Sequence, residues 1–488
     1  MIIEYIFFAL IAASIITFFM GKYSGSFSKI VALLVSIGVI AYSAAEFYKG
    51  YSGGYLSTYS ITLSSGSGFY FSLGLDGFTD ILIILASIIT LVALFVSREG
   101  NGIYYGLIML TEVGTFGLLL STDLFFFYVF WEIVLVPVYF LIGLYGGSRK
   151  DSVSLKFFVY THIGSVFILL SIFTLYSFYY TEKGILTMQI SSLLNPAFFT
   201  SMPYFYQIFV IAGFMIGFLV KLPSFPLHSW LPDSYETASY PVTVILAGAL
   251  SVMGGYGLFG ILYNIYAVIP VYIMWIFIYL GIISLIYFSL SAMFQTSLKR
   301  MMAYASASSM GFVMISFGSG LISTGTNSTI DLAGGIYQIF VHGLIVALIF
   351  SMLYYIKKYT GHDTTYGLGG IYREAPLMST LLLGGLLASL GLPGLAGFVA
   401  EFSIVAGSFQ AIGALVFFVI FAMIITASYH IWAAQRTLYG PYNEKLGPIH
   451  DLSRTELCAM LSIFIVILIL GVFPRIVFPM ITGYIGGF

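Results

Sequence analysis

The chain has 488 residues, of which 60% are hydrophobic and 8% are charged, with a mean hydropathy of +1.03. A soluble globular domain carries roughly 25% charged residues, so this composition excludes that class of protein. The net charge of −1 gives no indication of a nucleic-acid partner. The single cysteine, Cys458, excludes internal disulfides and cysteine-based metal or iron–sulfur sites.

Apolar runs of about 20 residues recur along the whole chain, and each is long enough to span a bilayer as an α-helix. Strand-like alternation is absent, so helices rather than a barrel are expected to satisfy the backbone. The first run lacks a basic segment and a cleavage site, which favours a retained helix over a signal peptide. The runs predict an all-α polytopic membrane protein with about fourteen helices, at residues 2–20, 28–47, 79–97, 103–121, 123–147, 154–178, 203–222 (continuing to 234), 240–263, 267–295, 300–321, 333–358, 376–410, 412–438 and 456–484.

The basic residues test this helix count independently. Three of the 18 fall in loops on one side, namely Lys49, Lys183 and Arg475, and Lys221 lies inside a helix. By the positive-inside rule the richer side is cytoplasmic, which places both termini on the outer side of a prokaryotic plasma membrane. The 14 residues on the richer side are Lys22, Lys29, Arg98, Arg149, Lys150, Lys156, Lys299, Arg300, Lys357, Lys358, Arg373, Arg436, Lys445 and Arg454.

Two extramembrane segments are long enough to carry structure of their own. The outer segment 51–71 is rich in Ser, Gly and Tyr and is predicted to fold back as a short hairpin. The cytoplasmic segment 359–375 holds several ionisable residues, and we interpret it as a solvated connector because loops are polar by default.

Few ionisable residues remain at membrane depth once the loops are assigned. An isolated charge near the bilayer centre costs ~2.5–3.5 kcal/mol on insertion scales, so several together indicate a hydrated polar seam inside the bundle. These residues are Glu112, Glu132, Lys221, His228, His342 and Glu401, with His162 and His430 nearer the membrane margins.

The segment FMIGFLVKLPSFPLHSWLPD places Lys221 at the end of an apolar run, and Pro223 and Pro226 then interrupt the helix. Unwound backbone within a membrane is tolerated only beside a cavity or inside protein, so the break marks a candidate transport site. Glu132 lies on another helix, in FYVFWEIVLVP. A carboxylate and a lysine close together can exchange protonation states near neutral pH, and the alternative interpretation is a structural ion pair.

A second interruption occurs in the other half of the chain. LGLPGLAGFVAEFSIVAGSF breaks a helix at Pro393 and Gly394 and places Glu401 eight residues after the proline. Broken helices at corresponding positions of two halves are typical of transporters. His342, in IYQIFVHGLIVALIF, lies on a helix between the breaks, and neutral imidazole can pass a proton in either direction. Non-functional proline kinks and a structural core histidine are the alternative interpretations.

Four segments resemble the antiporter-like subunits of respiratory complex I in order and spacing. They are FYVFWEIVLVPVYFLIGLYGG, VKLPSFPLHSWLPD, QTSLKRMMAYASASSMGF and GLPGLAGFVAEF. The FWE and PGLAGFVAEF runs are most similar to subunit M, the mitochondrial subunit four. Multisubunit Na+/H+ antiporters and membrane-bound hydrogenases contain subunits of the same superfamily, and the resemblance covers roughly residues 70–440.

The resemblance implies fourteen helices, two inverted five-helix repeats with discontinuous seventh and twelfth helices, and a central hydrophilic axis that moves protons. The corresponding segments of this chain would be N-terminal helices at 1–100, repeats at 101–264 and 265–440, and a C-terminal helix at 441–488. No cofactor or metal is implied, and electron transfer would belong to partners. Those partners would be other membrane subunits, including further antiporter-like subunits, together with lipid.

Matched motif by motif, four residues of this chain fall at the family's proton-carrying positions. Lys221, modulated by Glu132, would store and release a proton. His342 would relay the proton, and Glu401 would pass it to the exit side. Further candidates are His228, Glu112 and Lys299.

Three positions depart from the family pattern. Val252 stands where a lysine is expected, and Ser309 and Tyr235 stand where histidines are usual. A proton path needs a titratable group or ordered water at each gap. Three hypotheses therefore stay open: a proton-translocating subunit of a complex I-type donor:quinone oxidoreductase, a cation/proton antiporter module of a multisubunit antiporter or membrane-bound hydrogenase, and a structural membrane subunit with an impaired proton path.

Overall fold

The computed structural model describes residues 3–20, 24–51, 58–64, 68–97 and 101–486. Within these residues, twelve helices are long and apolar enough to cross a membrane. Two shorter apolar helices, Glu4–Phe19 and Pro376–Ser389, are also present. The prediction of an all-α, multi-pass membrane protein is confirmed, and the expected count of about fourteen is compatible with these helices. Lys22 and Arg98, assigned to the basic side, lie outside the described residues.

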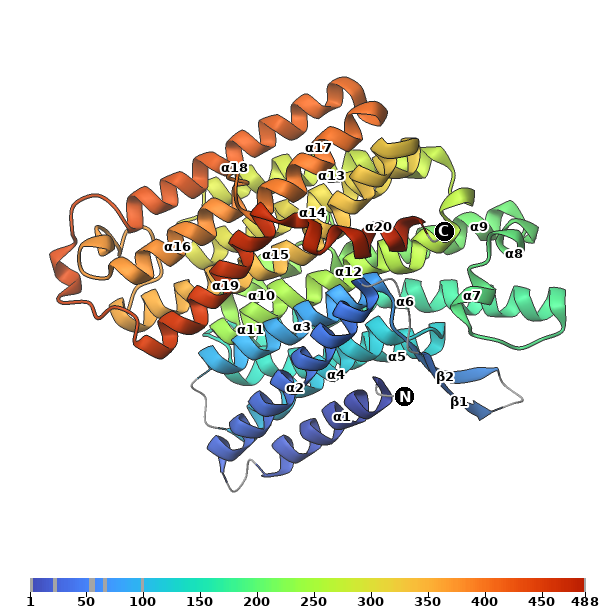
Figure 1. Ribbon diagram of the computed structural model, residues 1–488, viewed down its shortest axis with the longest axis horizontal. Coiled ribbons are helices and arrows are strands. Elements are labelled where there is room, and N and C mark those ends of the chain that lie inside the picture. The colour runs from blue at the N-terminus through green and yellow to red at the C-terminus, as the bar shows by residue number, and fades with distance from the viewer. Residues whose placement is uncertain (1–2, 21–23, 52–57, 65–67, 98–100, 487–488) are drawn as a thin grey trace. The chain divides into compact units, whose positions relative to one another are not determined.

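The chain divides into two compact units, and Figure 1 labels their elements. The first unit comprises Met1–Pro223, Ala249–Ile273 and Gly483–Phe488. The second comprises Ser224–Gly248 and Met274–Thr482. The segment boundaries expected at residues 100, 264 and 440 stay a prediction.

The first unit contains most of the N-terminal half of the chain. Its elements are α1 (Ile3–Met20), α2 (Gly25–Tyr51), β1 (Thr58–Ser64), β2 (Phe69–Gly74), α3 (Gly77–Val96), α4 (Gly102–Leu120), α5 (Leu124–Tyr145), α6 (Lys150–Lys183), α7 (Ile190–Leu193), α8 (Pro196–Ser201), α9 (Tyr204–Lys221), α12 (Ser251–Tyr256), η2 (Gly257–Ile261) and η3 (Leu262–Val268).

The helix at the centre of the first unit is α4, which packs against α1, α2, α3, α5 and α12. Glycines let its neighbours approach closely, as in many membrane bundles. A Cβ atom at Gly106 would lie 2.8 Å from the Cα of Phe18 in α1. One at Gly117 would lie 2.4 Å from the ring of Phe130 in α5. The close packing of α4 therefore depends on residues without side chains.

The hairpin predicted in segment 51–71 is confirmed, although it extends to Gly74. Strands β1 and β2 are antiparallel, with Thr58 opposite Gly74 and a register irregularity between Thr62 and Ser64. Residues 52–57 and 65–67 of the predicted hairpin lie outside the described residues. The short helices α7 and α8 were not predicted from the sequence. A local signal for α8 existed, because Asn195 accepts hydrogen bonds from the first amides and Pro196 follows it.

The second unit contains most of the C-terminal half of the chain. Its elements are α10 (Trp230–Thr237), α11 (Tyr240–Ile245), α14 (Leu298–Ile322), α15 (Gly325–Thr360), η4 (Ile371–Arg373), α16 (Pro376–Ser389), α17 (Ala396–Ile412), η5 (Gly413–Leu415), α18 (Val416–Thr437), η6 (Glu444–Leu446), α19 (Arg454–Val472) and η7 (Pro474–Ile476). Three elements cross the division between the units, namely η1 (Leu246–Leu250), α13 (Val271–Met293) and α20 (Phe478–Gly486).

The central helix of the second unit is α15, which packs against α11, α14, α16, α17 and α19. It is 36 residues long and begins at Gly325, eight residues before the predicted start. The sequence underestimated its length because the first two turns are polar, whereas hydropathy detects only apolar runs. Asp331, which the prediction left in a loop, is therefore a helical residue.

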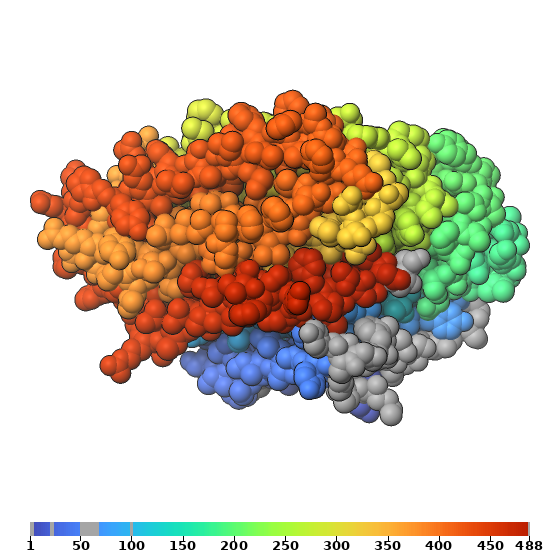
Figure 2. Space-filling view, turned by 45° about the horizontal axis from the view of Figure 1, so that its top comes forward, coloured from blue at the N-terminus to red at the C-terminus, as the bar shows by residue number. Residues whose placement is uncertain are grey.

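Figure 2 shows α17–α19, in orange and red, at the surface of the second unit. Large apolar side chains are exposed on α17 and α18. A helix that is apolar on its exposed face is typical of a membrane span. The exposed residues are Phe402, Phe409, Phe417, Phe418, Phe421, Ile424 and Ile431.

Both predicted helix breaks are confirmed. Helix α9 ends at Lys221 and α10 begins at Trp230. Helix α16 ends at Ser389 and α17 begins at Ala396, and Gly391 between them has φ +76°, a conformation that favours glycine. A third break ends the predicted helix 456–484 at Val472, because Pro474 cannot continue it.

The approach of α17 to α15 gives a test of this packing. A Cβ atom at Gly407 would lie 2.7 Å from the backbone nitrogen of Asp331, and rigid backbone cannot yield. We expect Gly407→Ala to lower the free energy of unfolding by about 1–3 kcal/mol, the usual range for overpacking. The measurement is unfolding of the purified complex in increasing denaturing detergent.

The matched control is Gly38→Ala, because a Cβ atom at Gly38 would meet nothing within 4 Å. This variant should unfold at the same detergent concentration as the native protein. Equal stability of both variants would contradict the close approach of α15 and α17.

Candidate functional site

Lys221 is the last residue of α9 and is only 2% exposed. Its Nζ lies 5.7 Å from the ring centroid of Trp131 in α5 and 5.8 Å from that of Phe157 in α6. Aromatic faces attract a cation without donating or accepting its proton. The amine is therefore buried among aromatic rings at the end of α9, where the first predicted helix break begins.

Glu132 pairs with His162 rather than directly with Lys221. The Oε2 of Glu132 lies 3.1 Å from the Nδ1 of His162, and their side chains are 24% and 45% exposed. The other carboxylate oxygen is buried and has no hydrogen-bond partner among the described residues. Trp131, adjacent to Glu132 in the chain, is the residue that faces Lys221. The sequence places His162 near a membrane margin but does not predict its pairing with Glu132, because a contact between α5 and α6 leaves no local signal.

Glu112 lies on α4, the central helix of the first unit, and is 2% exposed. The Oγ of Ser36 in α2 donates a hydrogen bond of 3.3 Å to its Oε2. Its Oε1 is buried without a partner in the described part of the chain. Among the described residues of the first unit, Glu112 is one of four carboxyls that the structure buries, together with Glu4, Asp80 and Asp123.

His342 lies in the middle of α15 and is 5% exposed. Its Nε2 lies 3.0 Å from the Oγ of Ser306 in α14. Ser309, which stands where the family usually has a histidine, lies one turn further along α14 and donates to the carbonyl of Ala305. The hydroxyl of Ser306 can exchange protons with the imidazole, so α14 retains a polar partner for His342.

Glu401 lies on α17 and is 4% exposed. Its carboxylate lies against the backbone of the break between α16 and α17. A Cβ atom at Gly391, in this break, would come within 2.4 Å of the Oε2 of Glu401. Any larger residue at Gly391 would displace the carboxylate. The break therefore provides the space that the buried glutamate occupies.

His228 lies in the segment between α9 and α10 and is 9% exposed. It lies among aromatic side chains. Its ring centroid is 5.9 Å from Phe225, 5.3 Å from Tyr287 and 4.7 Å from Phe288. Close by, the amide of Phe225 donates to the hydroxyl of Ser284, which satisfies part of the unwound backbone.

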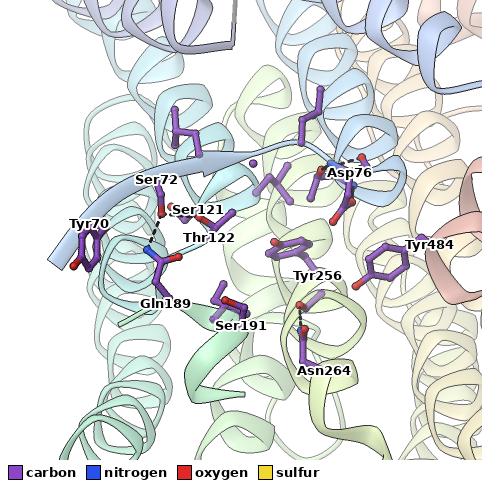
Figure 3. Close-up of a pocket in the computed structure, with 17 residues that line it drawn as sticks. Tyr70, Ser72, Asp76, Ser121, Thr122, Gln189, Ser191, Tyr256, Asn264 and Tyr484 are labelled. Carbon is purple, nitrogen blue, oxygen red and sulfur yellow. Dashed lines mark hydrogen bonds between the residues drawn. The ribbon is translucent and has the colours of Figure 1, made fainter. Parts of the chain in front are cut away.

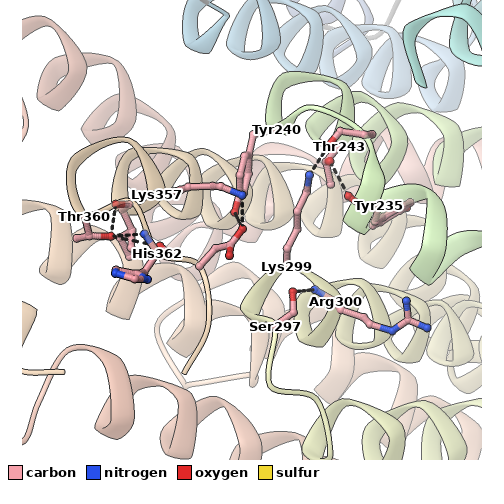
Figure 4. Close-up of polar contacts among 12 residues, drawn as sticks. Tyr235, Tyr240, Thr243, Ser297, Lys299, Arg300, Lys357, Thr360 and His362 are labelled. Atoms are coloured by element: carbon pink, nitrogen blue, oxygen red, sulfur yellow. Dashed lines mark hydrogen bonds and ion pairs between the residues drawn. The ribbon is translucent and has the colours of Figure 1, made fainter. Parts of the chain in front are cut away.

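Lys299, near the start of α14, is the centre of a polar network that Figure 4 shows. It is 4% exposed, donates to the carbonyl of Ala238 after α10, and lies 4.3 Å from the ring centroid of Tyr240. The Tyr240 hydroxyl donates to Asp363, which also pairs with Lys357 at 2.6 Å. One end of the connector 359–375, predicted to be solvated, is therefore anchored to the second unit.

Arg300 follows Lys299 and makes two ion pairs with α10. Its Nη1 lies 2.9 Å from Asp233 and 2.8 Å from Glu236. These side chains are 26%, 19% and 31% exposed, so water reaches each of them. The two pairs hold α10, the second part of the broken helix, against the start of α14.

Tyr235 and Val252, two of the departures from the family pattern, are both buried. The Tyr235 hydroxyl donates to the carbonyl of Leu246 at 3.0 Å. Leu246 begins the π-helical segment η1, where the regular pattern of helix hydrogen bonds is interrupted. Val252 is 1% exposed in α12. Tyr235 thus stabilises an irregular helix, and Val252 fills apolar space.

A cavity of about 620 Å³ lies in the first unit, and Figure 3 shows its lining. Asp76 points toward it from the start of α3, opposite the phenol rings of Tyr256 and Tyr484. Burial raises the pKa of the Asp76 carboxyl. The proposed proton carriers do not line this cavity. Across the described residues, no group of three or more His, Cys, Asp and Glu side chains is arranged to hold a metal ion.

The ion pairs of Arg300 generate a stability prediction. We expect Arg300→Ala to lower the free energy of unfolding of the complex by about 1–2 kcal/mol, because two partly buried carboxylates lose their partner. Denaturing-detergent titration of the purified complex measures this. Lys183→Ala removes the exposed pair with Glu182 and serves as the control, with no measurable change expected. Equal effects of both substitutions would show that the Arg300 pairs add nothing.

Comparison with known proteins supports the resemblance carried by the motifs. The chain is 36% identical over 424 residues to F(420)H(2) dehydrogenase subunit M of Methanosarcina mazei, with 85% of this chain and 83% of that protein covered. It is 35% identical over 433 residues to the chloroplastic NAD(P)H-quinone oxidoreductase chain 4 of Chaetosphaeridium globosum, with 84% and 81% covered.

Solved structures share the fold. A chain of respiratory complex I from Thermus thermophilus superposes with a TM-score of 0.84 at 24% identity, covering 98% of each chain. A chain of the Mrp complex from Dietzia sp. gives a TM-score of 0.83 at 20% identity, covering 99% of this chain and 96% of that one. The model of the family described as NADH:quinone oxidoreductase/Mrp antiporter, TM, matches residues 121–426, more than half of the chain. The chain belongs to this family of antiporter-like membrane subunits.

Proposed function

We propose that this protein is a proton-translocating, antiporter-like membrane subunit of a complex I-type oxidoreductase that passes electrons from a donor such as NADH or ferredoxin to a quinone. One observation carries the proposal. Lys221, His342 and Glu401 are 2%, 5% and 4% exposed within apolar helices, and two of them lie at helix breaks. Burying an ionisable side chain in such surroundings costs free energy, and the packing of the helices does not by itself require such a residue.

Each carrier has a role suited to its chemistry. Lys221 stores and releases a proton at the break of the seventh helix, and the charge of Glu132 modulates it. His342 relays the proton, since imidazole can accept at one ring nitrogen and release from the other. Glu401 receives it at the break of the twelfth helix. Glu112, His228 and Lys299 are further candidates, although the contacts of His228 and Lys299 are those of residues that hold the bundle together.

Electron transfer belongs to partner subunits in this proposal. The relatives named as dehydrogenase subunit M and quinone oxidoreductase chain 4 support such an assembly. The matched structures come from multisubunit membrane complexes. The excess of lysine and arginine on one side supports an orientation with both termini on the outer side of a prokaryotic plasma membrane.

Lys221 provides the direct test. We expect Lys221→Met to reduce donor-driven proton uptake by vesicles containing the whole complex at least about tenfold, because methionine fills the space without carrying a proton. The amount of assembled complex should stay unchanged. Lys183→Met, at a 47% exposed side chain, is the matched control and should pump normally. Native pumping by Lys221→Met would refute the assignment.

A second candidate function is a cation/proton antiporter module, which the fold similarity to a chain of the Mrp complex favours. In that case similar residues would handle an exchanged cation. Sodium-dependent proton movement in vesicles without any electron donor would support this function. Dependence on the donor alone would support the oxidoreductase.

A third candidate is a structural subunit with an impaired path, favoured by Val252 and Ser309. We expect Val252→Lys to lower assembly or pumping, because Val252 is 1% exposed and an ammonium there would be buried without a partner. Redox-coupled proton uptake per assembled complex measures the effect. A gain in pumping would instead mean that the valine weakens the native path.

A further inference from the structure

A polar stripe follows one face of α15, and the proposed path uses it only at His342. Asn327, Asp331, Gln338 and His342 are separated by four, seven and four residues. At 3.6 residues per turn these spacings place the four side chains on one side of the helix. Asp331, Gln338 and His342 are 0%, 4% and 5% exposed, whereas Asn327 is exposed. The stripe runs from the helix interior to its accessible end.

Serine side chains of α14 face this stripe at both ends. Ser306 contacts His342, as described above. Asp331 lies about 16 Å from His342 along α15, toward the start of the helix. There the Oγ of Ser319 donates to the Oδ2 of Asp331 at 2.6 Å, and the Oγ of Ser316 donates to the backbone carbonyl of Asp331 at 2.5 Å. The α14–α15 interface is therefore lined with hydroxyl groups that can accept and donate protons.

Asp331 differs from an ordinary interhelical hydrogen-bonding residue in one respect. Its Oδ2 accepts from Ser319, but its Oδ1 is buried and has no hydrogen-bond partner among the described residues. A carboxylate that only fastened two helices would be expected to satisfy both oxygens, because an unpaired buried acceptor is costly. The free oxygen is a position at which the carboxyl group can bind a proton.

Glu401 lies on α17, a helix that packs against α15. A Cβ atom at Gly407 would lie 2.7 Å from Asp331, and one at Gly334 would lie 2.9 Å from Ile404. Residue numbers thus rise along α17 as they fall along α15, so the helices are antiparallel. Glu401 precedes Ile404 by about one turn and is level with the part of the stripe between Asp331 and His342.

The stripe ends at a polar surface. Asp331 is six residues, or about 9 Å, from the first residue of α15. Asn327, one turn before Asp331, donates to the side-chain oxygen of Gln410 at 3.1 Å, and both residues are exposed. Only one helical turn separates the buried carboxyl from these exposed polar side chains.

We propose that Asp331 is a further proton-binding site, through which protons pass from Glu401 toward the Asn327 end of α15. This inference rests on the proposed function. The step is a proton transfer without redox change: the O–H bond of the Glu401 carboxyl breaks, the proton crosses the space between the two residues through water, and an O–H bond forms at Asp331. Asp331 then releases the proton to water at the Asn327 end and returns to the carboxylate.

Asparagine and serine-to-alanine variants separate this role from a structural one. Asp331→Asn keeps an acceptor for Ser319 but cannot carry a proton at that position. Ser319→Ala removes the hydrogen bond and leaves the carboxyl in place. Asp331→Glu keeps the carboxyl but changes its reach. A residue that merely clamps α14 to α15 should tolerate asparagine better than the loss of Ser319.

The test uses the complete complex in native membrane vesicles and measures protons moved per quinone reduced. We expect Asp331→Asn to lower this ratio at least about tenfold, while Ser319→Ala and Asp331→Glu retain most of it and all three assemble. Infrared difference spectra should lose a carboxyl band in Asp331→Asn alone. Native pumping by Asp331→Asn overturns the inference. Failure of Asp331→Asn to assemble, with the other two variants normal, assigns the carboxyl to folding and also overturns it.

Parallel measurement of Lys221→Met separates the two proposals. Loss of pumping in Lys221→Met with native pumping in Asp331→Asn refutes only the role of Asp331. Native pumping in Lys221→Met refutes the proposed function, whatever the result at Asp331.

Discussion

The structure depends on one constraint: in hydrocarbon, every backbone amide and carbonyl and every charged side chain must find its partner inside the protein. Both helix breaks follow from it. The unwound segment after α9 is held by a hydrogen bond from Phe225 to Ser284. The break before α17 is a compact glycine turn against which the Glu401 carboxylate lies. A broken helix survives here because protein, not lipid, surrounds it.

The central helices of the two units, α4 and α15, show how this constraint is met. Each is surrounded by other helices, and each bears residues that would be costly in lipid, Glu112 on α4 and Asp331 and His342 on α15. Glycines such as Gly117 and Gly407 permit the close approach that excludes lipid from these side chains. Rigid packing on all sides also holds these ionisable side chains at defined positions, as the proposed proton path requires.

The departures from the family pattern are accommodated in different physical ways. Tyr235 replaces a titratable ring by a hydroxyl that donates to an irregular part of the helix. Ser309 leaves His342 with Ser306 as its partner on α14. Neither residue leaves an unpaired buried hydroxyl of its own among the described residues.

The sequence by itself determined the membrane class, most of the spans and both helix breaks, because hydropathy over about 20 residues and the missing amide of proline act locally. It also identified Lys221, His342 and Glu401 as buried ionisable residues, since any charge within such a run is unusual. Only the tertiary structure decided their partners. The contact of His162 with Glu132 joins residues 30 apart, and that of Lys299 with Ala238 joins residues 61 apart. Such contacts, like the burial of Asp331 in the polar first turns of α15, depend on how each helix is rotated against its neighbours, which no local pattern specifies.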